Sequence, residues 1–249
     1  MSISVSLKSV SYGKRIALKD VKFELPGGSF TAVLGRNGSG KSTLVGALLS
    51  LLRYDGVIAF DGRPASLMSY KERGKNVSGV LQTPRAPHIT VYELVLFGRS
   101  TRVGGFKRYA EEDKLEVERA LEAASLLSLR EAYLDEISGG ELKRAYFAMA
   151  LAGGAKNLVL DEATASMDSD YESAFLSLER ALADDGKTIV AVMHNLEAAV
   201  RYADRILLLD GGGQLFFGTT EQILKTELIE KTFNVYRETV NGRVFFASK

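Results

Sequence analysis

Apolar and polar residues alternate in two stretches near the start of the chain, residues 3–7 and 21–25, and each alternation predicts a strand. A Pro-Gly-Gly turn at 26–28 follows the second stretch. The continuous apolar segment 30–34 then predicts a buried strand, and the mainly apolar segment 42–52 predicts a buried helix. We therefore expect the first part of the chain to be mostly strands, with one helix packed among them.

The pattern becomes helical between residues 89 and 152. Apolar residues recur there at helical spacing, with charges between them (Val117, Ala120, Leu121, Ala124 and Leu127). Strand patterns lie on both sides of this block, at 56–60 and 76–81 before it and at 158–160, 188–193 and 205–209 after it. Strands that alternate with helices imply an α/β fold with a doubly wound, mostly parallel sheet.

The N-terminal strands are expected to form an antiparallel part of this fold, and the helical block to be an inserted α-helical subdomain. The single domain 1–249 then divides into three parts. Residues 1–84 form the N-terminal β part and a first portion of the core, 85–153 form the helical insert, and 154–249 form the rest of the core and the C-terminal segment.

Composition excludes several classes of protein. Lys and Arg total 32 against 31 Asp and Glu, so the net charge of +1 lacks the basic excess that nucleic-acid binding requires. The chain has no cysteine, which excludes disulfides and thiolate metal sites. No apolar run approaches the roughly 20 residues that cross a bilayer, and no signal pattern begins the chain. We expect a soluble chain whose membrane role, if it has one, comes through a partner.

A phosphate-binding loop follows the apolar strand at 30–34. Residues 35–43 read Gly-Arg-Asn-Gly-Ser-Gly-Lys-Ser-Thr and fit the pattern G-x-x-x-x-G-K-[ST]. Backbone N–H groups of such a loop converge on phosphate oxygens, and the next helix adds its positive end. The ammonium of Lys41 is expected near the β- and γ-phosphates, and the hydroxyl of Ser42 on Mg²⁺. The nucleotide-binding candidates are Gly35, Asn37, Gly38, Ser39, Gly40, Lys41, Ser42 and Thr43.

Two carboxylates end a later apolar strand. Residues 158–162 read Leu-Val-Leu-Asp-Glu, and open α/β sheets bind ligands at such carboxyl ends. Adjacent strand residues point in opposite directions, so Asp161 and Glu162 should have different roles. We assign Asp161 to Mg²⁺ and Glu162 to the water that attacks the γ-phosphate. A carboxylate pair at this place can also simply cap a helix, and the phosphate loop is what favours the catalytic interpretation.

A second glycine-rich segment lies about a hundred residues after the phosphate loop. Residues 137–141, here called the signature segment, read Ile-Ser-Gly-Gly-Glu. One nucleotide needs one phosphate cradle, so two cradles in a chain suggest that each chain completes its partner's site. The expected working unit is a dimer.

These motifs, in this order, resemble the nucleotide-binding subunit of ATP-binding cassette (ABC) ATPases over essentially the whole chain. The resemblance implies a P-loop NTPase core of ABC type that binds ATP and Mg²⁺. It also implies that Tyr12 stacks on adenine, that Gln82 senses Mg²⁺ and γ-phosphate, and that His194 contacts the γ-phosphate. In the family, Ser138, Gly139 and Gly140 match the loop that grips the partner's ATP, and Asp168, in 165–168, matches the loop that crosses the dimer interface.

Simpler interpretations stay open for single residues. Tyr12 could be an ordinary strand aromatic, Gln82 a loop residue and His194 a hydrogen-bonded residue at a strand end. His88, beside a proline and without a metal partner, is expected to be structural or on the surface. The chain also departs from the family pattern at Ile137, at Ala163 and in the Ala-Met-Ala-Leu stretch 148–151. None of these departures removes a catalytic group, so we expect an active ATPase.

The segment 90–99 and the chain end at 233–245 resemble those of importers for iron–siderophore, haem and cobalamin. The resemblance therefore implies the ATP-binding subunit of a metal-chelate importer at the cytoplasmic face of the membrane. Its partners would be a second copy of the chain, transmembrane permease subunits that dock near Gln82 and the region up to Phe106, and a substrate-binding protein. An exporter ATPase and a non-transport ABC ATPase such as a cofactor-assembly scaffold remain alternatives. The sequence leaves open the ligand, the direction of transport, the turnover rate and whether the second ATPase is identical or a paralogue.

Overall fold

Ten strands form one large sheet in the computed structural model, which describes residues 2–12, 15–103, 108–164 and 168–249. Five of them run parallel, in the order β9–β3–β8–β7–β6. Their bounds are β3 Phe30–Gly35, β6 Val77–Val80, β7 Asn157–Asp161, β8 Thr188–Val192 and β9 Arg205–Asp210. This parallel core confirms the doubly wound α/β fold expected from the sequence.

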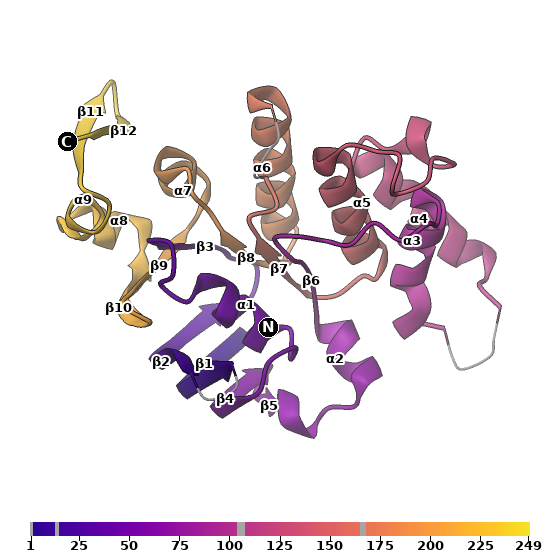
Figure 1. Ribbon diagram of the computed structural model, residues 1–249, viewed down its shortest axis with the longest axis horizontal. Helices are drawn as coiled ribbons and strands as arrows, with labels where there is room; N and C mark the ends of the chain where they lie inside the picture. Colours follow the sequence, from indigo (N-terminus) through magenta and orange to yellow (C-terminus); the bar gives the residue numbers. More distant parts are fainter. Residues whose placement is uncertain (1, 13–14, 104–107, 165–167) are drawn as a thin grey trace.

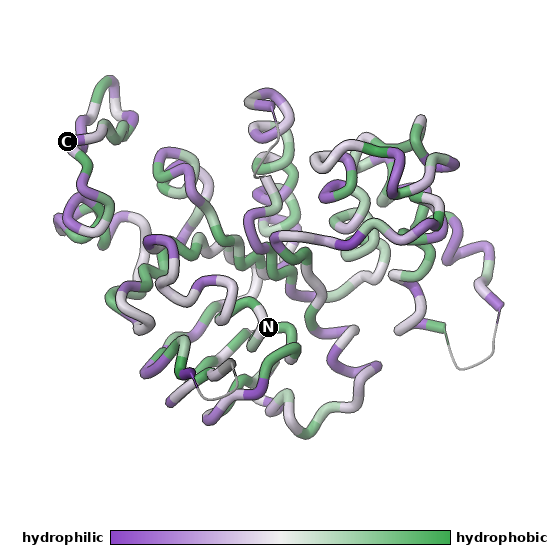
Figure 2. The backbone as a smooth tube through the Cα atoms, in the orientation of Figure 1, coloured by the Kyte–Doolittle hydropathy of each residue, from purple (hydrophilic) through white to green (hydrophobic). Residues whose placement is uncertain are grey.

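Residues along the parallel strands alternate between two hydrophobic cores, because successive side chains point to opposite faces of a sheet. Val33, Val159 and Val190 belong to the core that contains the apolar side of helix α1, Lys41–Leu48. Their neighbours in sequence, such as Leu34 and Leu158, belong to the core on the other face. Both faces are covered, which explains why these strands read as continuous apolar runs. The central strands accordingly appear largely green in Figure 2.

The other strands of the large sheet are mostly antiparallel and lie below the parallel strands in Figure 1. They are β1 Ser2–Tyr12, β2 Arg15–Pro26, β4 Tyr54–Phe60, β5 Arg63–Pro64 and β10 Gly213–Thr219. Buried residues of β1 and β4, Ile3, Val5 and Ile58, pack in the same core as helix α1. Helix α1 is therefore held between the two parts of the sheet, as expected for a buried helix after the phosphate loop.

Three helices with their own hydrophobic core form the helical part at one end of the molecule (Figure 1). They are α3 Val91–Phe97, α4 Glu111–Ala123 and α5 Gly139–Ala152, with the short helices η2 Gly98–Thr101 and η3 Leu127–Leu129 between them. Helix α5 also packs on the parallel sheet, because Phe147 shares a core with Leu158 and Leu160 of β7. The ring of Phe147 lies 4.4 Å, between centroids, from that of Phe175 in the same core. The helices lie within the predicted insert 85–153, whose exact boundaries remain a prediction.

The remaining elements cover the sheet and end the chain. They are η1 Ala65–Leu67, α2 Tyr70–Asn76, α6 Ser169–Asp184, α7 Leu196–Tyr202, α8 Thr220–Leu224, α9 Leu228–Phe233, β11 Val235–Val240 and β12 Arg243–Ser248. Strands β11 and β12 form a separate hairpin at the C-terminus. Helix α2 and strand β10 were not anticipated from the sequence. Among the residues described, no helix is long and apolar enough to cross a membrane.

One buried carboxyl group stands apart from the rest of the core. Glu179 on α6 is 1% exposed and lies among apolar residues of that helix, and its Oε2 atom has no hydrogen-bond partner. Burial raises the pKa of Glu179 to about 8. Because the charged form is disfavoured in a low-dielectric interior, the carboxyl is protonated in the folded state at neutral pH.

Glu179 should therefore make stability depend on pH. Between its ordinary pKa of 4.5 and about 8, the folded state holds a proton that the unfolded state releases, so stability falls as pH rises through this window. At about 1.4 kcal/mol per pKa unit, the loss is on the order of a few kcal/mol. Glu179→Gln keeps the shape of the side chain and cannot ionise. The melting temperature of the wild type should fall as the pH rises through this window, and the variant should abolish this fall.

The matched control is Glu111→Gln, which alters a carboxylate that is 85% exposed on α4. It should leave the pH dependence of the melting temperature as in the wild type. An unchanged fall in Glu179→Gln would show that Glu179 is ionised in the folded protein.

Candidate functional site

The phosphate loop connects β3 to α1 through a tight turn. Gly40, the residue before α1, has a φ of +100°, a conformation that side chains with a Cβ rarely adopt. A Cβ added there would lie 2.8 Å from Cδ1 of Leu18 and 3.1 Å from the carbonyl oxygen of Ala17. Both the backbone angle and the close approach of β2 therefore require glycine, and the N-terminus of α1 opens directly from this turn.

Lys41 folds over the loop that precedes it. Its Nζ donates hydrogen bonds to the carbonyl oxygens of Gly35, at 2.7 Å, and Arg36, at 3.1 Å. Burial lowers the pKa of Lys41, and the charges of Glu162 and Asp161 partly oppose that shift. The result is a cation fixed at the mouth of the phosphate loop and facing two carboxylates.

Asp161 is the last residue of β7 and is 3% exposed. The hydroxyl of Ser42 hydrogen-bonds to its carboxyl group, whereas the buried Oδ1 atom has no hydrogen-bond partner. Burial raises the pKa of Asp161, the charge of Glu162 raises it further, and the Ser42 hydrogen bond and the Lys41 charge act in the opposite direction. An unpaired buried carboxylate oxygen is costly, and a cation would remove that cost.

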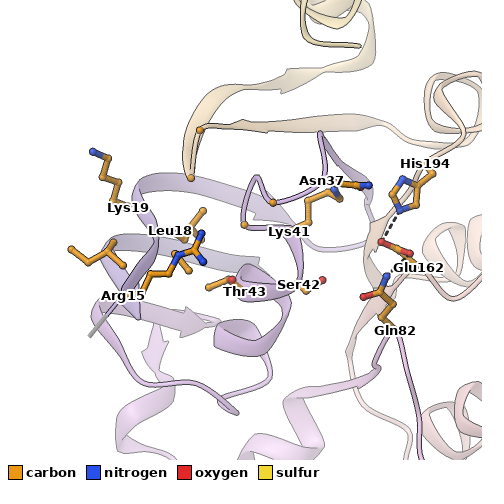
Figure 3. Close-up of a pocket in the computed structure, with 16 residues that line it drawn as sticks. Arg15, Leu18, Lys19, Asn37, Lys41, Ser42, Thr43, Gln82, Glu162 and His194 are labelled. Carbon is orange, nitrogen blue, oxygen red and sulfur yellow. Dashed lines mark hydrogen bonds and ion pairs between the residues drawn. The ribbon is translucent and has the colours of Figure 1, made fainter. Parts of the chain in front are cut away.

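Glu162 follows the strand end in a left-handed conformation, with a φ of +52°. Its Oε1 lies 2.6 Å from Nε2 of His194, and its Oε2 accepts a hydrogen bond of 2.7 Å from Nε2 of Gln82. Figure 3 shows the three side chains converging at one side of the cavity. The turn at Glu162, and not strand alternation alone, directs its carboxylate away from that of Asp161.

Strand register explains why these residues meet. Val192 of β8 pairs with Val33 of β3 on one side and with Asp161 of β7 on the other. Val80 of β6 pairs with Leu160 of β7. Each site residue follows one of these aligned positions by one or two residues, so Gln82, Glu162 and His194 leave the sheet at the same edge.

A cavity of about 900 Å³ contains this edge and the phosphate loop. Its lining includes sequence candidates from the loop (Asn37, Gly38, Gly40, Lys41, Ser42 and Thr43) together with Gln82, Glu162 and His194. Asp161 lies beneath the lining, in contact with Ser42. Residues of β2 (Arg15 to Lys19) and of the β9–β10 turn (Gly211 and Gly212) complete the opposite wall, and no motif in the sequence marks them as site residues.

Other sequence candidates lie away from this wall. Ser138, Gly139 and Gly140 begin helix α5 and do not line the cavity. The Ser138 Oγ accepts a hydrogen bond from the N–H of Glu141, and the Glu141 carboxylate accepts one from the N–H of Ser138. This capping box fixes the start of α5. The Ser138 hydroxyl also hydrogen-bonds to the Glu141 carboxylate, which lowers the pKa of Glu141.

Two further candidates are only partly described. Asp168 is exposed and directly precedes helix α6, without capping it through its side chain. Residues 165–167, and the side chain of Tyr12 at the end of β1, lie outside the part of the chain that the structure describes. The roles assigned to Tyr12 and Asp168 stay predictions. His88 is exposed, pairs with Asp135 and stacks on Tyr133, in agreement with a surface role.

The donors around Asp161 fit Mg²⁺. This ion prefers oxygen ligands and usually binds through one or two protein oxygens, together with phosphate oxygens and waters. The Ser42 hydroxyl, the unpaired Oδ1 of Asp161 and the amide oxygen of Gln82 are ligands of this kind. Among the described residues, no group of three or more His, Cys, Asp or Glu side chains could hold a metal ion. The set therefore suits a cation that arrives with a nucleotide.

The family model for ABC transporters matches residues 18–165, which is more than half of the chain. The chain belongs to the ABC transporter family. This match includes the phosphate loop, Gln82, the signature segment, and Asp161 and Glu162 at the end of β7. As an ABC-type ATPase, the chain binds ATP and couples its hydrolysis to transport.

Several curated relatives are similar over nearly the whole chain. The iron(3+)-hydroxamate import ATP-binding protein FhuC of Bacillus subtilis is 32% identical over 96% of this chain and 90% of its own length. The ferric enterobactin transport ATP-binding protein FepC of Escherichia coli is 34% identical over 91% of this chain and 85% of its own length. The manganese transport ATP-binding protein MntB of Halalkalibacterium halodurans is 32% identical over 93% and 91%, respectively.

Solved structures agree with this assignment. A metal-chelate type ABC transporter in an inward-facing conformation superposes with a TM-score of 0.81 at 28% identity and covers 99% of this chain and 96% of its own. A dimeric ATP-binding cassette with bound ADP and phosphate superposes with a TM-score of 0.79 at 26% identity, covering 88% and 99%. The ABC-type fold with a helical subdomain is thereby confirmed.

Proposed function

We propose that this chain is the ATP-binding subunit of an importer for a metal chelate of the iron–siderophore, haem or cobalamin type. The arrangement of Gln82, Glu162 and His194 beside the phosphate loop supports the ATPase chemistry. The cargo is supported by the names of the relatives, which transport iron chelates or manganese. Permease subunits and a substrate-binding protein would complete the system.

In this proposal the phosphate loop and Lys41 hold ATP. Backbone N–H groups of the loop and the N-terminus of α1 bind the phosphate oxygens, and the Lys41 ammonium lies between the loop and the two carboxylates. Ser42, Asp161 and Gln82 would hold Mg²⁺, which neutralises charge on the phosphates. Tyr12 would stack on the adenine ring.

Glu162 would act as the general base. Burial raises the pKa of Glu162, but hydrogen bonds from His194 and Gln82 and the charges of His194 and Lys41 outweigh that effect, so the pKa is lowered overall. The carboxylate is therefore ionised at neutral pH and can take a proton from water. The water oxygen then bonds to the γ-phosphorus, and the bond to the bridging oxygen breaks to leave ADP. His194 and Gln82 hold both carboxylate oxygens in place.

The signature segment would serve the ATP of a second copy. Ser138, Gly139 and Gly140 do not line the cavity of their own chain, yet they offer the N-terminus of helix α5 and its backbone N–H groups. Two copies arranged head to tail would bring each signature segment onto the partner's nucleotide. Asp168, exposed before α6, would lie at the same interface.

A groove of about 640 Å³ between the core and the helical part would receive the permease. Apolar side chains that are 42–74% exposed line it (Leu51, Tyr70, Leu81 and Phe97), with Arg73 and Arg85 beside them. Leu81 precedes Gln82, and the hydroxyl of Tyr146 on α5 donates to the carbonyl oxygen of Arg85 at 2.7 Å. A cytoplasmic segment with apolar and acidic side chains would fit this groove and contact both the core and the helical part.

Glu162→Gln tests the general base. The variant should bind ATP as the wild type does, because the phosphate loop is untouched. Its turnover should fall by about 10²–10⁴, since the proton acceptor is lost. Steady-state phosphate release and ATP titration measure the two quantities, and gel filtration with ATP should show a trapped dimer. Turnover at the wild-type rate would mean that another group activates the water.

Mixed dimers test whether Ser138 serves the partner's ATP. Ser138→Arg and Lys41→Ala chains should each be inactive alone, the first because closure is blocked and the second because phosphate binding is lost. Mixed together, they leave one intact site only if Ser138 works in trans. When equal amounts combine at random, half of the dimers are mixed, and each mixed dimer has one intact site out of two. Activity should then return to about a quarter of the wild-type rate. A mixture that stays inactive would place Ser138 on its own chain's nucleotide.

Phe97→Glu tests the permease groove. Phe97 is 61% exposed, so a charge there should leave folding and ATP binding intact but weaken an apolar interface. The wild-type chain, extracted from its native membranes in detergent, should carry a membrane-spanning subunit that mass spectrometry identifies, and the variant should lose it. Leu115→Glu, at a 58% exposed position on α4 outside the groove, is the control. Equal recovery with Phe97→Glu would exclude this groove, and an exporter-type subunit would contradict the importer proposal.

A further inference from the structure

Lys143 connects the helix that carries the signature segment to the catalytic strand end. It lies on α5, five residues after Ser138, and is 8% exposed. Its Nζ donates a hydrogen bond of 2.9 Å to the backbone carbonyl oxygen of Glu162. Lys143 thus contacts the residue whose side chain faces the cavity, although it does not line the cavity itself.

The residue that Lys143 contacts has an unfavourable backbone conformation. Glu162 is not glycine, and its φ of +52° is a left-handed conformation that residues with a Cβ adopt only rarely. Gln82 and His194 contact the side-chain carboxylate of Glu162, and neither of these contacts fixes the peptide group that follows Glu162. The ammonium of Lys143 binds the oxygen of that peptide group. The side-chain carboxylate and the backbone carbonyl of Glu162 are therefore held by residues from different parts of the chain.

Charge adds to the effect of the hydrogen bond. Burial lowers the pKa of Lys143, whereas the charges of Glu162 and Asp161 raise it. These same two carboxylates oppose the lowering of the Lys41 pKa. Both carboxylates therefore interact electrostatically with two lysines, Lys41 from the phosphate loop and Lys143 from the signature helix.

We propose that Lys143 is a positioning residue that holds Glu162 in its left-handed conformation and links the signature helix to the catalytic carboxylate of the same chain. The inference rests on the proposed role of Glu162. Lys143 does not line the cavity, so it should affect the rate of hydrolysis and not the binding of ATP. When the signature segment binds the partner's nucleotide, a movement of α5 would be transmitted through this hydrogen bond to Glu162, which acts on the nucleotide of its own chain.

Lys143→Met tests this role, because methionine keeps an unbranched apolar chain and removes the ammonium. The kcat for ATP hydrolysis should fall, by up to about 100-fold for a shift near 1 Å, with KM unchanged. Lys143→Arg, which restores a charged donor, should recover part of the rate. Lys187→Met is the matched control, since Lys187 is another partly buried lysine whose Nζ donates to a carbonyl oxygen, that of Ala155, at 2.9 Å. It should keep the wild-type kcat.

Thermal melts separate positioning from damage to the fold. Lys143→Met should melt within a few degrees of Lys187→Met, because each variant loses an ammonium that donates to a backbone carbonyl oxygen. A wild-type kcat in Lys143→Met, or an equal loss of kcat in Lys187→Met, would overturn the proposal. Failure of the proposed function would look different, because Glu162→Gln would then hydrolyse ATP normally.

Mixed dimers decide which nucleotide Lys143 serves. One chain carries Glu162→Gln, so hydrolysis occurs only at the site of the other chain. Lys143→Met in that other chain should slow hydrolysis as in the homodimer. Lys143→Met placed beside Glu162→Gln in the first chain should leave the rate of the mixed dimer unchanged. The opposite pattern would show that Lys143 acts through the signature segment and would overturn its role in positioning Glu162.

Discussion

The parallel pairing of β6, β7, β8 and β3 is the constraint on which the rest of the structure depends. Four segments far apart in the sequence end at one edge because their hydrogen-bonded registers are fixed, and burial on both faces prevents those registers from slipping. A slip of one residue in β7 would turn Leu158 and Leu160 to the wrong core. It would also separate Asp161 from Ser42, so the packing that stabilises the sheet also sets the geometry of the site.

The sequence anticipated the parts of the site that are local. The phosphate loop and the two carboxylates are contiguous motifs between recognisable strands, so their positions followed directly from the pattern. Gln82 and His194 followed only from the family resemblance, and the reason that they meet at Glu162 lies in strand register, which a single sequence does not specify. The roles of these residues, and the boundaries of the helical insert, remain predictions.

Other features could not be read from the sequence for identifiable reasons. A left-handed backbone is ordinarily signalled by glycine or asparagine, and Glu162 gives no such signal. The predicted helix at 42–52 ends earlier, at Leu48, because Ser50 also turns into a positive φ. Lys143 reads as a polar position in a helix, and only the tertiary packing of α5 shows that its ammonium reaches the carbonyl of Glu162. Short elements such as α2 lack enough periods for a pattern to be evident.

The two hydrogen bonds of Lys41 have a consequence for the entropy of nucleotide binding. A free lysine side chain has about 2 kcal/mol of rotamer entropy to lose when it binds a ligand. The Lys41 ammonium already bonds to the carbonyl oxygens of Gly35 and Arg36, so most of that ordering took place when the protein folded. Phosphate meets a preorganised cation and needs only to exchange hydrogen-bond partners with it. The cost of immobilising the lysine is thus carried by the stability of the folded chain and not by the affinity for ATP.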